Sequence, residues 1–104
     1  MTPLRLSYAY GTSQQPLLGM TIGDKFDQAC VQYADQDALI SVHQNVRLSY
    51  KQLQDKVNAF ACSLLKLGLE KGDRLGIWSP NCVEWTIAQF AAFKAGIILV
   101  NLNP

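Results

Sequence analysis

The sequence has 104 residues, which is enough for one small domain but not for a catalytic domain together with a regulatory one. Apolar residues make up 49% of the chain and charged residues 16%, a composition that excludes intrinsic disorder. The net charge of +1 and the lack of a basic patch argue against a nucleic-acid partner. Apolar runs such as residues 97–100 are far too short to cross a bilayer.

Residues 1–20 are expected to form an extended lead-in, because prolines and glycines recur through them. Thr21 is then a candidate helix N-cap, and Asp24 takes the place of the Glu or Gln of a capping box. Apolar residues follow at helical spacing, which predicts a helix of about three turns that ends at residues 35–37. Its apolar face would consist of Ile22, Phe26, Ala29, Cys30 and Tyr33.

Residues 38–42 and 46–50 are two β-prone runs separated by three polar residues, which predicts a β-hairpin. Asn45 suits the left-handed conformation that a tight connection often needs. His43, the only histidine, lies in the predicted turn with no nucleophile nearby in the sequence for it to activate. A solvated turn residue is therefore expected rather than a catalytic base.

Ser49 and Gln52 form a capping box that predicts the start of a second helix. Gly68 lies where a helix commonly ends in the left-handed conformation. The apolar stripe between these ends would contain Leu53, Val57, Phe60, Ala61, Leu64 and Leu65.

Residues 71–78 predict a Lys-Gly-Asp turn followed by a short strand. Ser79 is expected to cap a third helix, with Pro80 as the first helical residue and Gly96 just after the last. Residues 97–100 are an unbroken apolar run, which is typical of a parallel strand buried on both faces. The sequence therefore predicts an α/β fold with one β-hairpin, one parallel βαβ unit and three helices.

The loop at residues 79–81 lies where open α/β sheets usually bind ligands, beyond the carboxyl end of a strand. A nucleotide-binding loop would contain several glycines, because only glycine lets the backbone approach a phosphate closely. Pro80 instead removes one N–H donor from this loop. A small nucleotide-binding domain is thus a disfavoured alternative.

The carboxylates do not form the inward-facing pair that acid–base chemistry needs: Asp35 and Asp37 follow a predicted helix, and Asp73 is expected only to fix its turn. The three cysteines, Cys30, Cys62 and Cys82, are too few and too far apart for a disulfide framework or a zinc site. We expect them to be small buried hydrophobic residues of a protein from a reducing compartment.

Three long side chains near the third helix are also assigned structural roles. Trp78 and Trp85 are expected to be buried, with a ligand-stacking platform as the minor alternative. Lys94 is expected to be a surface cation whose stem covers apolar neighbours. No catalytic, cofactor-binding or metal-ligating residue is assigned anywhere in the chain.

Four segments resemble the adenylate-forming, or AMP-binding, superfamily, to which the acyl-CoA synthetases belong. The hexapeptide LSYKQL at residues 48–53 resembles its first core motif, and FKAGIILVNLNP at residues 93–104 resembles its second. Residues 68–75 and 79–85 also fit the pattern of the CoA ligases. The resemblance implies that residues 21–104 are an N-terminal portion of the large AMP-binding domain.

The resemblance also implies a two-step reaction for the complete enzyme. A fatty acid attacks the α-phosphate of ATP, assisted by magnesium, to give an acyl-adenylate and pyrophosphate, and the thiol of CoA then displaces AMP. The phosphate loop, adenine pocket, ribose-binding aspartate and catalytic lysine of the family do not occur in this sequence. We therefore expect an N-terminal fragment of a fatty acid–CoA ligase that is inactive alone and binds none of ATP, magnesium and CoA.

The resemblance leaves three further expectations. An alternative function is a non-catalytic interaction or regulatory module derived from such an enzyme. The isolated chain is expected to expose an apolar patch and to self-associate. The lead-in resembles that of mitochondrial medium-chain acyl-CoA synthetases, which implies the mitochondrial matrix, with the cytoplasm as the alternative; any targeting peptide would lie upstream of Met1 or be absent.

Overall fold

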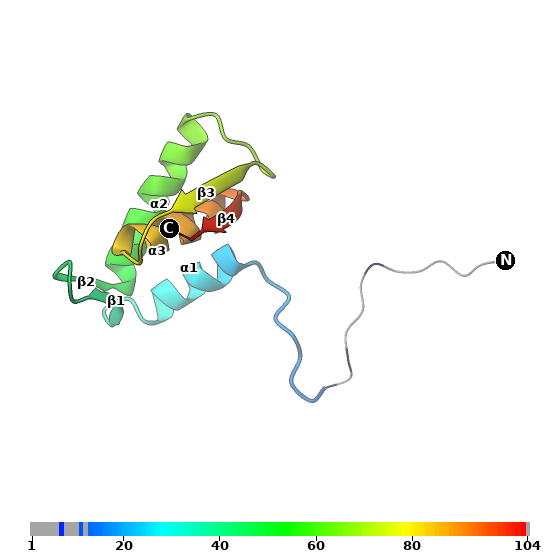
Figure 1. Ribbon diagram of the computed structural model, residues 1–104. Coiled ribbons are helices and arrows are strands. Elements are labelled where there is room, and N and C mark those ends of the chain that lie inside the picture. Colours follow the sequence, from blue (N-terminus) through cyan, green and yellow to red (C-terminus); the bar gives the residue numbers. More distant parts are fainter. Residues whose placement is uncertain (1–6, 8–10, 12, 104) are drawn as a thin grey trace.

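The computed structural model describes Ser7, Gly11 and residues 13–103. Its elements pack as three helices against two small sheets, and the described part of the lead-in, residues 13–20, is exposed and lies outside any helix or strand (Figure 1). In chain order the elements are α1 (Ile22–Gln32), β1 (Asp37–Ser41), β2 (Val46–Ser49), α2 (Tyr50–Lys66), β3 (Arg74–Trp78), α3 (Val83–Ala95) and β4 (Ile98–Leu102). The predicted α/β fold, a hairpin plus one parallel βαβ unit with three helices, is confirmed.

Helix α1 begins as predicted, because the Thr21 hydroxyl accepts a hydrogen bond from the Asp24 N–H at 3.1 Å. It ends at Gln32, earlier than residues 35–37. Its buried face is also narrower than predicted: Phe26 and Cys30 are buried, whereas Ile22 and Tyr33 are exposed. The ring of Phe26 stacks on Phe90 of α3 with 4.6 Å between ring centroids, and this contact selects the side of α1 that faces inward.

The hairpin pairs β1 and β2 in antiparallel register, with Ser41 opposite Val46. Asn45 has a φ of 54°, which confirms the left-handed residue expected in the connection. The turn is one residue longer than predicted, because Val42 lies in it rather than in the strand and its side chain is 88% exposed.

Helix α2 carries the predicted capping box. The Ser49 hydroxyl accepts a hydrogen bond from the backbone N–H of Gln52 at 3.1 Å. The side-chain carbonyl oxygen of Gln52 accepts one from the backbone N–H of Ser49 at 2.9 Å. After the helix, Gly68 has a φ of 95°, as expected for a left-handed end. The prediction was wrong for Phe60 and Leu65, which are 39% and 53% exposed.

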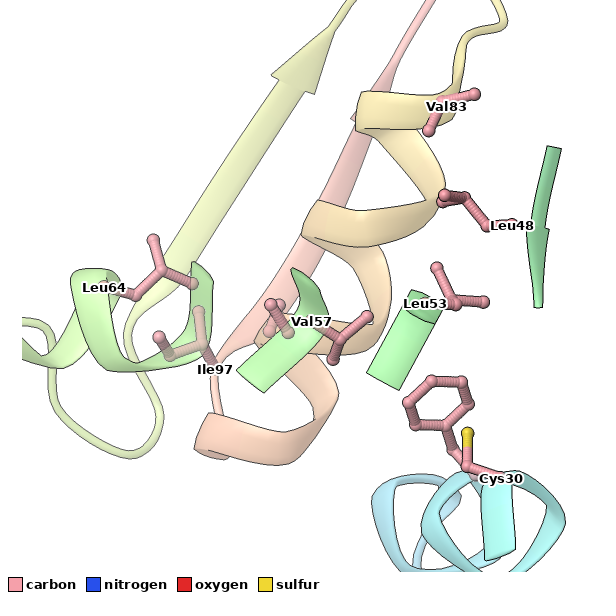
Figure 2. Close-up of a cluster of buried hydrophobic side chains, with 10 residues drawn as sticks. Cys30, Leu48, Leu53, Val57, Leu64, Val83 and Ile97 are labelled. Atoms are coloured by element: carbon pink, nitrogen blue, oxygen red, sulfur yellow. The ribbon is translucent and has the colours of Figure 1, made fainter. Parts of the chain in front are cut away.

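One hydrophobic core joins all these elements, with α2 at its centre. Figure 2 shows side chains of α2, α3 and the hairpin meeting in this cluster, with Cys30 of α1 at one end. Val57 of α2 is 0% exposed and is the largest fully enclosed side chain of the core. The buried residues are Phe26, Cys30, Leu48, Leu53, Val57, Leu64, Val83, Ala91, Ala92 and Ile97.

Strands β3 and β4 pair in parallel, from Arg74 opposite Ile98 to Trp78 opposite Leu102, with α3 as the crossover between them. The prediction that residues 97–100 are buried on both faces was wrong. Alternate side chains of the two strands point away from α3, and no described element covers them. We call this surface the exposed sheet face; it consists of Trp78, Ile98, Val100 and Leu102.

Gly96 ends α3 in the left-handed conformation, with a φ of 75°. A Cβ at this position would lie 3.2 Å from Lys71 Cγ. We predict that Gly96→Ala lowers the free energy of unfolding by about 1–2 kcal/mol, because an L-residue is strained in this region. The measurement is the urea midpoint followed by circular dichroism.

Gly76→Ala is the matched control for Gly96→Ala. Gly76 has no positive φ, and its added Cβ would meet only Leu102 Cδ1 at an ordinary 3.6 Å. Its free energy of unfolding should stay within about 0.5 kcal/mol of the parent or rise slightly. Equal losses in the two variants would contradict the conformational explanation.

Candidate functional site

The loop between β3 and α3 differs from the prediction at the start of the helix. Helix α3 begins at Val83, and its N-cap is Cys82, which makes no side-chain capping hydrogen bond. Ser79 and Pro80 precede the helix rather than starting it, and the Ser79 hydroxyl donates to the Pro80 carbonyl oxygen at 2.9 Å. The predicted start of α3 is wrong because the group that caps this helix comes from the hairpin and not from the residues just before the helix.

Gln44, in the hairpin turn, supplies this cap. Its side-chain carbonyl oxygen accepts hydrogen bonds from the Val83 N–H at 2.8 Å and from the Ser41 hydroxyl at 2.9 Å. Its amide nitrogen donates to the Glu84 carboxylate at 3.0 Å. The Gln44 hydrogen bond, together with a backbone N–H and the thiol of Cys82, holds the pKa of Glu84 below its ordinary value.

The Gln44 contact also bears on nucleotide binding. An N–H at the start of a helix can bind a phosphate only while it is free. The Val83 N–H is already occupied by Gln44, and the loop before it contains Pro80 and no glycine. The geometry of the described residues is that of a capped helix start, which disfavours a phosphate at this position.

We predict that Gln44→Ala lowers the free energy of unfolding by about 0.5–2 kcal/mol, the usual cost of losing a helix cap. The pKa of Glu84 should rise toward its ordinary value of 4.5, because the Gln44 amide is the largest influence that lowers it. The measurements are urea unfolding and a titration of the Glu84 carboxyl by nuclear magnetic resonance.

Gln32→Ala is the control for Gln44→Ala, because Gln32 is exposed at the end of α1. Its stability should change by less than about 0.5 kcal/mol. A Gln44→Ala chain with parental stability and an unchanged Glu84 titration would show that the cap contributes nothing.

His43 is exposed in the hairpin turn, as predicted. The statement that it has no nucleophile nearby was wrong, because the Ser41 hydroxyl lies 3.4 Å from His43 Nδ1. That hydroxyl donates its proton to Gln44, however, and not to the imidazole. A cleft of about 290 Å³ beside them is also lined by Asn81 and Cys82, but no Ser–His or Cys–His pair is aligned in it for nucleophilic catalysis.

The aspartates are separated as the sequence indicated. Asp37 forms an exposed ion pair with Arg47 across the hairpin, and Asp35 is exposed in the turn before it. The Asp73 carboxylate accepts a hydrogen bond from the Glu70 N–H at 2.7 Å, which confirms that it stabilises its own turn. None of these three carboxylates faces another across a cleft.

Two predictions of burial were wrong. Trp78 is 74% exposed because it lies on the exposed sheet face, while Trp85 is half-buried. All three cysteines are free, but only Cys30 is buried; Cys82 is half-buried and Cys62 is exposed. Cys62 lies on the outer side of α2, so its neighbours cannot enclose it.

Lys94 is not the surface cation that was predicted, because its side chain is only 18% exposed. Its ammonium group donates to the Asp27 carboxylate of α1 at 2.7 Å and to the Asn58 side-chain oxygen of α2. The Gln54 amide of α2 donates to the same Asp27 oxygen at 3.0 Å. We call these four residues the Lys94 cluster; it joins α1, α2 and α3.

The Lys94 cluster sets the proton affinity of Asp27. Burial raises the pKa of Asp27, but the hydrogen bonds from Lys94 and Gln54 and the charge of Lys94 outweigh it, so the pKa lies below its ordinary value. Burial and the nearby Asp27 charge raise the pKa of the Cys30 thiol.

We therefore predict that Asp27 makes the chain less stable in acid. Because its folded pKa is lowered, its contribution is fully present above the ordinary aspartate pKa of 3.8 and is lost as the pH falls from there through the folded pKa. Urea unfolding of the parent and of Asp27→Asn across the acid range measures this contribution. The difference between the two chains should shrink as the pH falls, and a constant difference would contradict the prediction.

Among the residues that the structure describes, no three His, Cys, Asp or Glu side chains converge as metal ligands. None of the described helices is both long and apolar enough to cross a membrane. The conspicuous polar contacts of the described side chains, those of Gln44 and Lys94, connect one element to another.

Comparison with known proteins identifies the origin of this scaffold. The chain is 43% identical over 99 residues to "Medium-chain acyl-CoA ligase ACSF2, mitochondrial" of Mus musculus and 41% identical over 99 residues to the protein of the same name of Homo sapiens. Each alignment covers 95% of this chain but only 16% of the relative. The chain thus spans about a sixth of the length of these curated relatives.

The fold is shared with solved structures. The inhibitor-bound N-terminal domain of FACL13 from Mycobacterium tuberculosis superposes with a TM-score of 0.77 at 31% identity, covering 80% of this chain and 21% of that one. The sequence also matches the AMP-binding enzyme family over residues 26–104, which include both core motifs expected from the sequence. The chain belongs to the AMP-binding enzyme family.

Proposed function

We propose that this chain serves as the N-terminal part of a medium-chain fatty acid–CoA ligase. The observation that carries the proposal is the identity of 41–44% to the ACSF2 ligases over nearly the whole chain. The likeness in fold to the N-terminal domain of FACL13 supports it independently of the sequence motifs. Under this proposal the complete protein acts in lipid metabolism and uses ATP, magnesium and CoA.

In the proposed reaction the fatty acid carboxylate attacks the α-phosphorus of ATP and pyrophosphate leaves. The CoA thiol then attacks the acyl carbonyl of the adenylate, forming the thioester and releasing AMP. We assign no residue of this chain to either step, because its conspicuous polar groups are engaged with one another. Its role is to supply packed helices and strands on which the reactive parts are built.

A chimeric enzyme tests this proposal. The segment of mouse ACSF2 that aligns with this chain is replaced by this chain, and AMP release with octanoate, ATP, magnesium and CoA is compared with that of the mouse protein. The chimera should retain fatty acid–dependent AMP release within about tenfold, since volume-conserving exchanges of a core are tolerated. A folded chimera without activity would contradict the proposal.

The chain alone should be inactive in the same assay. Fatty acid–dependent AMP release by the isolated chain would overturn its purely structural role, whatever the chimera does. The chimera therefore tests whether this chain can serve as the N-terminal part of the ligase. The isolated chain tests whether this part has catalytic activity of its own.

A second candidate function is a non-catalytic interaction module that binds a complete ligase. The exposed sheet face favours it, because apolar patches of this kind commonly mark association surfaces. Under either function we infer that the isolated chain self-associates through this face. Co-purification with a complete ligase in equal amounts would favour the interaction module over the N-terminal part of the enzyme.

We infer a mitochondrial location, because the names of the ACSF2 relatives include the word "mitochondrial". The matrix is our proposed compartment within the organelle. The alternative is the cytoplasm. Cell fractionation followed by protease protection of the complete protein distinguishes them: a matrix protein resists protease until the inner membrane is opened.

A further inference from the structure

Helix α1 is attached to the rest of the molecule through few side chains. Phe26 and Cys30 are its only buried side chains, and Val31 and Ile22 face solvent. Exposed residues precede the helix, and the exposed turn before β1 follows it. Figure 1 shows α1 at the edge of the helical layer, with residues 13–20 running away from the body. An element with so little buried surface can separate locally without global unfolding.

Besides the stacking of Phe26 on Phe90, two features fix α1 on α3, and both involve Lys94. The first is the ion pair between Lys94 and Asp27, which Gln54 and Asn58 complete from α2. The second is a close approach, since a Cβ on Gly23 would lie 3.3 Å from Lys94 Cα. The Lys94 cluster thus connects the face of α1 to both other helices at a point where the backbones nearly touch.

We propose that α1 opens and closes as a unit on the layer formed by α2 and α3, and that Lys94 is the latch that holds it closed. When α1 is closed, the ammonium group joins three helices and Cys30 is enclosed, with 1% of its surface exposed. When α1 opens, Cys30 and the Phe90 ring reach solvent while the α2–α3 core stays intact. The α2–α3 core can stay intact because the residues that enclose it, such as Val57, belong to elements other than α1.

Thiol labelling of the full chain tests this inference. Cys30 is buried on the inner face of α1, while Cys62 on α2 is exposed and serves as an internal standard in each sample. At low protein concentration, the labelling rate of Cys30 relative to Cys62 is measured in increasing urea. Local opening exposes little surface, so the rate should depend only weakly on urea, whereas opening by global unfolding would show the full urea dependence.

Two variants loosen the latch in different ways. Lys94→Met removes the ammonium group but keeps an unbranched side chain only one atom shorter. Gly23→Leu wedges α1 off Lys94 without changing any charge or weakening the helix. Each should speed Cys30 labelling roughly 10- to 100-fold, while the amide exchange of Val57 changes far less. The control is Lys51→Met, which breaks an exposed ion pair with Asp55 and should leave Cys30 labelling unchanged.

The outcomes separate cleanly. Weak urea dependence in the parent, with faster labelling in either folded latch variant, supports the inference. Cys30 labelling that follows global unfolding in the parent overturns it, and so does acceleration of Cys30 and Val57 exposure to the same extent in the variants. If one variant fails to fold, the parent and the other variant still decide.

Discussion

Val57→Asp should unfold the chain. Val57 is 0% exposed at the centre of the core, and none of the buried residues in the described part of the chain is polar or charged. An unpaired buried charge costs at least about 4 kcal/mol, a large fraction of the roughly 5–15 kcal/mol that stabilises a typical domain. Far-ultraviolet circular dichroism at about 25 °C should show loss of the helical signal.

Val42→Asp is the matched control, since Val42 is 88% exposed in the hairpin turn. It introduces the same charge into the same residue type and should change the free energy of unfolding by less than about 0.5 kcal/mol. In the chimeric ligase, Val57→Asp should abolish activity and Val42→Asp should retain it. A folded Val57→Asp chain would mean that the core of the isolated chain is open to water.

The local features of the fold could be predicted from the sequence because each depends on residues a few positions apart. The capping box of Ser49 and Gln52 involves two residues within one helical turn, and the structure contains both of its hydrogen bonds. Gly96 and Asn45 were placed correctly for the same reason, since a left-handed residue is chosen by its own backbone.

The failed predictions depend on contacts between distant parts of the chain. The start of α3 was misplaced because its cap, Gln44, lies 39 residues away from Val83, and no spacing rule connects them. The prediction of a surface cation at Lys94 is wrong because its partner Asp27 is 67 residues away. A local pattern reports which face of a helix is apolar, but not which polar side chain another helix will bring to it.

The candidate site shows the same division. The types and spacing of the chemistry-bearing residues predict no catalytic role for them, and the described geometry places His43 and Asp73 in turns. What the sequence could not supply was the hydrogen bonding around His43: the hydroxyl of Ser41, two residues away, donates to Gln44, and Cys82 lies within hydrogen-bond distance of Ser79. Proximity alone would have suggested a nucleophile, and the hydrogen-bond directions argue against one.

Replacing Trp78 and Val100 together by threonine should weaken self-association of the isolated chain by at least about tenfold, which corresponds to ~1.4 kcal/mol. Both side chains lie on the exposed sheet face, and Trp78 presents 74% of its surface to solvent. Truncating a tryptophan at an association surface commonly costs more than about 2 kcal/mol. Threonine keeps the strand preference of these positions, so β3 and β4 should remain paired. Sedimentation velocity over a range of concentrations measures the association.

Val42→Thr is the control for the sheet variants, because it removes an equally branched and more exposed apolar side chain from the hairpin turn, outside the exposed sheet face. It should leave the association unchanged. If Val42→Thr weakens association as much as the double variant does, general surface apolarity and not the exposed sheet face drives it. A parent chain that stays monomeric at every concentration would show that the exposed sheet face is not an association surface. It would also contradict the argument that the parallel strands β3 and β4 require a cover on both sides.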